Sequence, residues 1–340
     1  MTTIPASAKH DVKAMMDAAA IPGVGIAVIR DFEITDTCYL GLADVETGEP
    51  VTERTTFQAA SISKPFCATV IHLLSERGDI DLDVDINEVM SSWTLPAAGF
   101  DTPVTIRDLL GHTGGLGDAL GYPGYAPGEP LPSPVEIVGG TGPSNTVGAF
   151  RDHAPGGDMK YSGGGYQLLQ LIAEDVTGRP LSELVKQMVF DPLKMKMSSH
   201  FDPVDVSEAS RAHDEGGVAR EYRWLQYPET SAAGMWTTPV DLAKYMVELL
   251  NACRDRGSTV VSTKIARAMG TRVRENNYGL GLEIQAAAIG HGGGNWGFSS
   301  SMMGIPDHGK GLAVMTNCWG MPTYEFLPKV TDVVTSAVDG

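Results

Sequence analysis

The segment SISK at residues 61–64 places a hydroxyl and an amine three residues apart. Apolar residues recur at helical spacing over residues 66–77, so we expect Ser61 and Lys64 to lie one turn apart on one helix face. A serine at a helix N-terminus meets the positive end of the helix dipole, and a partly desolvated lysine can accept its proton. The spacing fits a serine nucleophile with a lysine base. The structural alternative is a helix-capping serine beside a solvated lysine.

Further motifs follow in order along the chain. FQAASISKPF at residues 57–66, with GDIDLD at 78–83, resembles the nucleophile segment of class C β-lactamase-like serine hydrolases. That family includes class C β-lactamases, D,D-peptidases, D-aminopeptidases and β-lactamase-like carboxylesterases. The resemblance covers about residues 21–317 through further segments: IRDLLGHTGGL at 106–116, YSGGGY at 161–166, DPLKM at 191–195, AAGMWTTPVDL at 232–242 and GHGGGNWGF at 290–298.

The resemblance implies a role for each of four side chains. Ser61 would be the nucleophile and Lys64 its proton acceptor. Tyr161 would be the second acid/base group, because a nearby Lys64 would favour the phenolate of a side chain that ordinarily titrates near pH 10. His291, where related enzymes have Lys or His, would polarise the site, orient Tyr161 or bind a substrate carbonyl or carboxylate. A buried core tyrosine is the alternative for Tyr161.

Backbone groups complete the implied site. The N–H groups of Ser61 and Gly294 would form an oxyanion hole, and Gly293 with its glycine neighbours would let the substrate lie close to the strand. No metal or organic cofactor is implied. Residues 292–297 also fit the dinucleotide-binding pattern G-x-G-x-x-G, but a strand is expected at 298–305 where that motif requires a helix. We therefore reject a dinucleotide site.

Two residues depart from the family pattern. Gly163 stands where the Y-x-N motif has Asn, and His291 stands where true class C β-lactamases have Lys. Both weaken the case for efficient β-lactam turnover. We expect a serine acyl hydrolase that forms a covalent acyl-enzyme with small esters or D-aminoacyl amides, with esters slightly favoured. The alternatives are a β-lactamase or D,D-carboxypeptidase, an acyl-binding protein with little turnover, and an acyl transferase that uses an alcohol or amine.

Hydrophobic patterns predict the elements that position these groups. Strands are expected at residues 23–30, 37–41, 279–287, 299–305 and 311–317. Helices are expected at residues 11–20, 66–77, 106–110, 166–176, 181–189, 239–250 and 324–338. This order implies an α/β layer, of α+β type, whose sheet joins both ends of the chain around an inserted, mostly helical lobe. The resemblance implies an antiparallel sheet of β-lactamase or penicillin-binding-protein type, flanked by N- and C-terminal helices.

We expect one domain of two lobes over residues 1–340. The first lobe would combine about 1–60 with 275–340, and the second would comprise about 61–274. Residues 111–165 are rich in Gly and Pro, which is typical either of an active-site border or of a solvated loop. Tyr122 and Tyr125 in this stretch could line a pocket mouth.

Composition disfavours several classes of protein. The formal net charge of −17 would repel nucleic acid. No apolar run approaches the roughly 20 residues of a membrane-spanning helix, and the polar N-terminus favours a cytoplasmic location. The cysteines are scattered, and Cys67 is expected in the core. Histidines without metal-ligand spacing are His112, His200, His213 and His308. His112 is expected to be structural. The sequence leaves the oligomeric state open.

Overall fold

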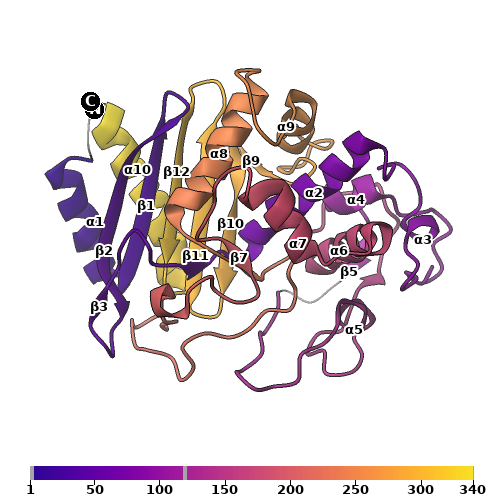
Figure 1. Ribbon diagram of the computed structural model, residues 1–340, viewed down its shortest axis with the longest axis horizontal. Coiled ribbons are helices and arrows are strands. Elements are labelled where there is room, and N and C mark those ends of the chain that lie inside the picture. Colours follow the sequence, from indigo (N-terminus) through magenta and orange to yellow (C-terminus); the bar gives the residue numbers. More distant parts are fainter. Residues whose placement is uncertain (1–3, 118–120, 340) are drawn as a thin grey trace.

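A seven-stranded antiparallel sheet lies beside a group of helices in the computed structural model, which describes residues 4–117 and 121–339 (Figure 1). The strand order is β3-β2-β1-β12-β11-β10-β9. β1 (Gly23–Arg30) pairs with β12 (Lys310–Thr316), so both ends of the chain meet in the sheet. The predicted sheet is confirmed. Its other strands are β2 (Glu33–Asp44), β3 (Glu49–Pro50), β9 (Glu283–Gln285), β10 (Ala288–Asn295) and β11 (Phe298–Ile305).

Helices cover both faces of the sheet. Successive side chains of a strand point to opposite faces, and β1 is apolar on both. Its even-numbered valine and isoleucine residues pack in one cluster with α1 (Ala6–Ala18) and α10 (Met321–Asp339). Its odd-numbered residues join the main core with α8 (Pro239–Cys253) on the other face. The sheet is therefore the middle layer of three.

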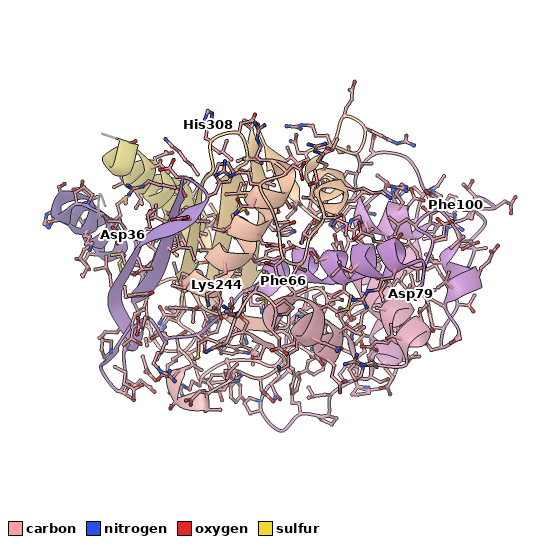
Figure 2. All side chains as sticks on the ribbon, turned by 45° about the horizontal axis from the view of Figure 1, so that its top comes forward. Asp36, Phe66, Asp79, Phe100, Lys244 and His308 are labelled. Carbon is pink, nitrogen blue, oxygen red and sulfur yellow. The ribbon has the colours of Figure 1, made fainter. Side chains whose placement is uncertain are left out.

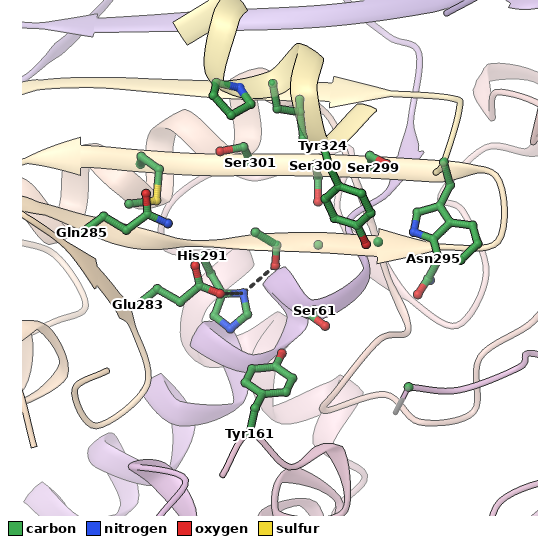
Figure 3. Close-up of a pocket in the computed structure, with 18 of the residues that line it drawn as sticks. Ser61, Tyr161, Glu283, Gln285, His291, Asn295, Ser299, Ser300, Ser301 and Tyr324 are labelled. Carbon is green, nitrogen blue, oxygen red and sulfur yellow. Dashed lines mark hydrogen bonds and ion pairs between the residues drawn. The ribbon is translucent and has the colours of Figure 1, made fainter. Parts of the chain in front are cut away.

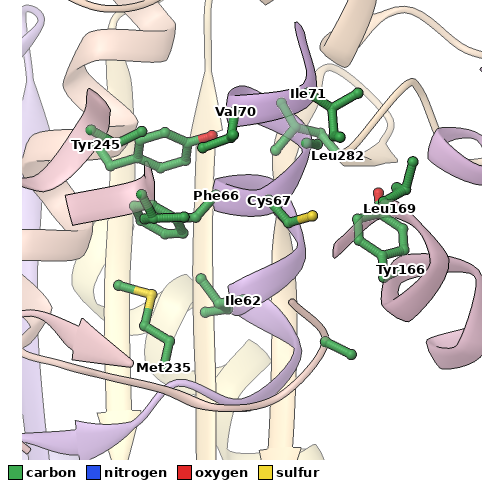
Figure 4. Packing of buried hydrophobic residues seen from close by; sticks show 14 of the residues in the cluster. Ile62, Phe66, Cys67, Val70, Ile71, Tyr166, Leu169, Met235, Tyr245 and Leu282 are labelled. Carbon is green, nitrogen blue, oxygen red and sulfur yellow. The ribbon is translucent and has the colours of Figure 1, made fainter. Parts of the chain in front are cut away.

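α2 (Ser63–Arg77) lies on the same side of the sheet as α8, packs against the helical group that includes α6, and is buried over most of its length. Figure 4 shows Cys67 on this helix, with Tyr166 of α6 (Gly163–Thr177) on one side and Tyr245 of α8 on the other. Burial raises the pKa of the Cys67 thiol, as expected for a packing residue. Packing on both sides fixes the N-terminal end of α2, where the SISK segment lies.

Capping residues fix three helix ends. α2 ends at Gly78 and α6 at Gly178, and both glycines take the left-handed conformation that glycine adopts without strain. The hydroxyl of Thr238 accepts a hydrogen bond from the N–H of Asp241 and begins α8. These caps set the lengths of the three helices that meet in the core.

Short elements fill the rest of the chain. The helices are α3 (Ile86–Val89), α4 (Ile106–Leu110), α5 (Pro134–Gly139), α7 (Leu181–Val185), α9 (Thr263–Gly270), η1 (Ala60–Ile62), η2 (Lys186–Phe190) and η3 (Val206–Glu208). The strands are β4 (Phe57–Gln58), β5 (Leu116–Gly117), β6 (Phe150–Arg151), β7 (Ser199–His200) and β8 (Met235–Thr237). In Figure 2, Phe66 lies in the interior, whereas Asp79 and His308 lie at the surface.

Several predicted boundaries are wrong. The stretch predicted as one strand at 279–287 contains only β9, because Ala286 takes a left-handed φ of 51° and the chain turns back into β10. The Gly- and Pro-rich stretch 111–165 contains α5, which begins with a capping box between Ser133 and Glu136. α1 and α10 begin earlier than predicted, β2 is longer, and α9 was not predicted. The division into two lobes stays a prediction.

Among the described helices, none combines the length and the apolar character needed to cross a membrane. The four cysteines all lie within the described residues and are free thiols. Three of them are buried and Cys253 is partly exposed, which bears out the expectation of buried thiols for all but this one.

Candidate active site

Ser61 and Lys64 lie together at the N-terminal end of α2. Ser61 belongs to the short helix η1, which leads directly into α2. The Nζ of Lys64 donates hydrogen bonds to the Oγ of Ser61 at 3.1 Å and to the carbonyl oxygen of Ala232 at 3.0 Å. Lys64 is almost fully buried, so these two acceptors and its neighbouring rings replace water around the amine. The geometry suits proton exchange between the hydroxyl and the amine.

The turn that carries Ser61 is held from both sides. Ala60 takes a left-handed φ of 51°, which costs an L-residue roughly 1–2 kcal/mol. The carbonyl oxygen of Ala59 accepts a hydrogen bond from the Oγ of Ser300 on β11 at 2.8 Å. The N–H of Ala59 donates to the carbonyl of Met235 on β8 at 2.8 Å. These two strands therefore anchor the strained turn.

Tyr161 lies over Lys64 and beside His112. The Nζ of Lys64 is 4.8 Å from the centroid of the Tyr161 ring, and the His112 ring is 4.5 Å from it. Tyr161 is 44% exposed, so a substrate in the pocket can reach it. Figure 3 shows its hydroxyl pointing toward the side of the pocket formed by β10. The prediction that Tyr161 and Lys64 are neighbours is confirmed, whereas the acid/base role of Tyr161 stays a prediction.

His112 positions the backbone next to Tyr161. Its Nδ1 accepts a hydrogen bond from the N–H of Ser162 at 3.1 Å. Burial, together with Lys64 and His291, holds the pKa of His112 well below its usual range. The ring is therefore neutral, with its proton on Nε2. This geometry agrees with the predicted structural role.

His291 on β10 is buried beside the same cluster. Its Nδ1 lies 2.5 Å from the carbonyl oxygen of Gly292 and 3.5 Å from the Oε1 of Glu283 (Figure 3). Its ring centroid is 6.1 Å from that of Tyr161. Burial lowers the pKa of His291, although the carboxylate of Glu283 acts in the opposite direction. His291 is thus a neutral imidazole near neutral pH.

A pocket of about 880 Å³ opens above these groups. Its lining includes Ser61, Tyr161, His291 and the three glycines at 292–294 (Figure 3). Within the described residues, β10 pairs with β9 only at 288–290, so beyond that point its outer edge faces η1. A Cβ on Gly293 would lie 2.2 Å from the carbonyl oxygen of Ala59. Glycine at 293 is therefore what lets β10 approach the nucleophile turn.

Comparisons with known proteins identify the family. The family model named Beta-lactamase matches residues 8–331. The chain belongs to the Beta-lactamase family. The curated relative Esterase EstB of Burkholderia gladioli is 31% identical over 200 residues, or 54% of this chain and 48% of that protein. Penicillin-binding protein 4* of Bacillus subtilis (strain 168) is 26% identical over 306 residues, or 82% of this chain and 64% of that protein.

A solved structure with a similar fold is D-amino acid amidase from Ochrobactrum anthropi SV3 complexed with L-phenylalanine. It has a TM-score of 0.77 and 25% identity, over 98% of this chain and 99% of that chain. The chain spans only part of the length of the curated relatives that it matches, for example 44% of Penicillin-binding protein 4 of Amycolatopsis lactamdurans. The Beta-lactamase family match and this similarity confirm the predicted family and fold, and the similar proteins include an esterase, an amidase and a penicillin-binding protein.

The departure from the Y-x-N motif has a structural counterpart. Gly163 begins α6, and a Cβ there would lie 2.7 Å from the Oη of Tyr122. Tyr122, which lines the pocket as predicted, therefore occupies the space into which an Asn side chain would extend. The prediction for Tyr125 is wrong: this residue is buried, pairs with Gln226 and does not line the pocket.

The sequence analysis did not predict two groups of pocket residues. Glu283 is brought to His291 only by the β9–β10 hairpin. Trp319 and Tyr324 form part of the far wall, near Gly294. The alanines at the turn of this hairpin carry no turn signal in the sequence, and the second group depends on how α10 packs. Within the described part of the chain, no group of three or more His, Cys, Asp or Glu side chains gathers in a way that could hold a metal ion.

Proposed function

We propose that this chain is a serine acyl hydrolase that forms a covalent acyl-enzyme through Ser61. The observation that carries the proposal is the hydrogen bond from the buried Nζ of Lys64 to the Oγ of Ser61, at the floor of an open pocket. A serine hydroxyl becomes a useful nucleophile only when a base takes its proton. Lys64 is hydrogen-bonded to that hydroxyl, and the ring of Tyr161 lies beside the Lys64 amine.

The reaction would proceed in two halves. In the first, the Oγ of Ser61 forms a bond to the substrate carbonyl carbon while its proton passes to the Lys64–Tyr161 pair. The N–H groups of Ser61 and Gly294 would stabilise the oxyanion. Tyr161 then protonates the leaving group as the carbonyl re-forms. In the second half, water attacks the acyl ester by the same route and releases the acid.

Small esters are the favoured substrates, followed by D-aminoacyl amides. The charged side chains among the described lining residues are Glu283 and Asp332, and both are acidic. An acidic lining disfavours substrates with a carboxylate, such as β-lactams and D,D-peptides. Esterase EstB and D-amino acid amidase are among the proteins that this chain resembles, which supports the same two substrate classes. The cytoplasmic location stays a prediction.

The test follows hydrolysis of a short-chain nitrophenyl ester beside a chromogenic cephalosporin, with Ser61→Ala as the control. We expect sustained ester turnover that depends on Ser61, and little cephalosporin turnover. Fast cephalosporin turnover would favour a β-lactamase instead. A single stoichiometric burst would favour an acyl-binding protein, and faster ester loss with added alcohols or amines would favour a transferase. Equal activity of wild type and Ser61→Ala would reject the nucleophile assignment.

A further inference from the structure

Glu283 faces the same ring nitrogen of His291 as a backbone carbonyl does. The Oε1 of Glu283 lies 3.5 Å from the Nδ1 of His291, and the carbonyl oxygen of Gly292 lies 2.5 Å from that nitrogen. A carboxylate and a carbonyl can only accept hydrogen bonds. The proton of the neutral imidazole must therefore be on Nδ1, and Nε2 presents a lone pair.

That lone pair is directed into the catalytic cluster. Nε2 of His291 is buried and has no hydrogen-bond partner among the described residues, which is uncommon for an interior acceptor. Figure 3 shows it on the side of the ring nearer to Tyr161. The ring centroids of Tyr161 and His291 are 6.1 Å apart, a separation that a phenol hydroxyl and a ring nitrogen can bridge when they point toward each other.

We propose that His291 holds a proton during acyl transfer, and that Glu283 is the positioning residue that orients and charge-balances it. The proposal rests on the proposed function, since Ser61 supplies the proton. As the bond from Oγ to the substrate carbon forms, Lys64 takes the hydroxyl proton of Ser61 and gives a proton to Tyr161, which passes its own to Nε2. The imidazolium beside the Glu283 carboxylate returns that proton through Tyr161 when the leaving group departs, so no net proton is gained or lost.

The neighbours of His291 determine the sign of the expected pH effect. Burial lowers the pKa of His291, Glu283 on β9 raises it, and Lys64 on α2 lowers it. The His112 ring and the phenol of Tyr278 also face this cluster. Since the neutral imidazole is the proton acceptor, activity should fall as the pH drops through the pKa of His291. Without the charge of Glu283, that fall should occur at lower pH.

Three variants separate charge from orientation. Glu283→Gln keeps an oxygen acceptor and removes the charge, whereas Glu283→Leu removes both. Glu33→Leu is the matched control, because it removes an exposed strand carboxylate on β2, which lies far from β9 in the sheet and does not line the pocket. Each variant is assayed for kcat and KM on a nitrophenyl ester across pH. Imidazole nitrogen NMR of the unliganded protein, assigned with His291→Gln, reports the tautomer and its titration.

We expect the wild-type NMR spectrum to show His291 protonated on Nδ1. Glu283→Gln should move both the NMR titration of His291 and the acidic limb of kcat/KM to lower pH. Glu283→Leu should lower kcat by roughly tenfold or more with KM within about twofold, and Glu33→Leu should change neither.

A wild-type His291 protonated on Nε2, or an unmoved titration in Glu283→Gln, would overturn the proposal, as would a Glu283→Leu variant with unchanged kcat. If wild type shows no Ser61-dependent turnover, the proposed function fails. The NMR titration still decides whether Glu283 controls His291.

Discussion

Gly293→Ala tests how closely β10 must approach the nucleophile turn. The added Cβ would lie 2.2 Å from the carbonyl oxygen of Ala59 and 2.5 Å from the Oγ of Ser300. An ordinary carbon–oxygen contact is more than 1 Å longer than the first of these, and a backbone oxygen cannot rotate away. β10 or η1 must therefore shift by roughly 1 Å, and such overpacking typically costs about 1–3 kcal/mol of stability.

A shift of this size should affect catalysis more than binding. Misplacing reacting groups by about 1 Å can cost roughly 100-fold in rate, which corresponds to about 2.7 kcal/mol in the barrier. We therefore expect kcat for a nitrophenyl ester to fall by about two orders of magnitude, with a lowered midpoint of thermal unfolding. The matched control is Gly292→Ala, whose Cβ would have Ser300 O as its nearest neighbour at 3.8 Å.

Gly292→Ala should keep the wild-type midpoint of thermal unfolding, because its Cβ meets only an ordinary van der Waals contact. The reasoning fails if Gly293→Ala retains wild-type kcat and stability. It also fails if the two alanine variants lose stability equally, since contact with the turn would then not be the cause.

Three further predictions concern the base, the pocket wall and the core. Lys64→Met should lower kcat for the ester by roughly 10³-fold or more while the fold survives, and activity above a tenth of wild type would exclude Lys64 as the base. Gly163→Asn should reduce ester turnover, because the new side chain would collide with Tyr122. Combining Gly163→Asn with Tyr122→Ala should instead accelerate acylation by a chromogenic cephalosporin. No gain in the double variant would contradict the proposed role of Tyr122. Burial lowers the pKa of His72 to about 4, from its ordinary 6.5 in an unfolded chain. Because the unfolded chain then binds the proton more readily than the folded one, about 3 kcal/mol of the stability present above pH 6.5 should be lost as the pH falls toward 4. Urea unfolding at several pH values should show this loss in wild type and a weaker one in His72→Gln.

The parts of the site that the sequence predicted are those fixed by local geometry. Ser61 in η1 and Lys64 in the first turn of α2 are three residues apart in one continuous helical run, so their spacing alone brings them together. The strand at 23–30 was predicted at its observed bounds, because a run of apolar and β-branched residues buried on both faces leaves few other conformations. Gly78 likewise marks the end of α2 by its own conformational preference.

The parts that were missed depend on contacts between distant or irregular segments. Glu283 reaches His291 only after Ala286 reverses the chain, and the apolar pattern of 279–287 hides that turn. Tyr122 meets Gly163 across a loop whose path the composition does not specify. The capping box of α5 was visible as Ser133 and Glu136, but the surrounding glycines and prolines suggested an irregular stretch.

The pairing of β1 with β12 also constrains the order in which the molecule can be made and folded. β1 is synthesised long before its partner β12, so this contact has a very large sequence separation, which favours slow folding. β10 and β11, which line the pocket, join the sheet through β12. An incomplete chain therefore cannot assemble the pocket around Ser61. The proposed hydrolase activity would thus report completion of folding, because a chain that lacks β12 would expose Ser61 without the pocket around it.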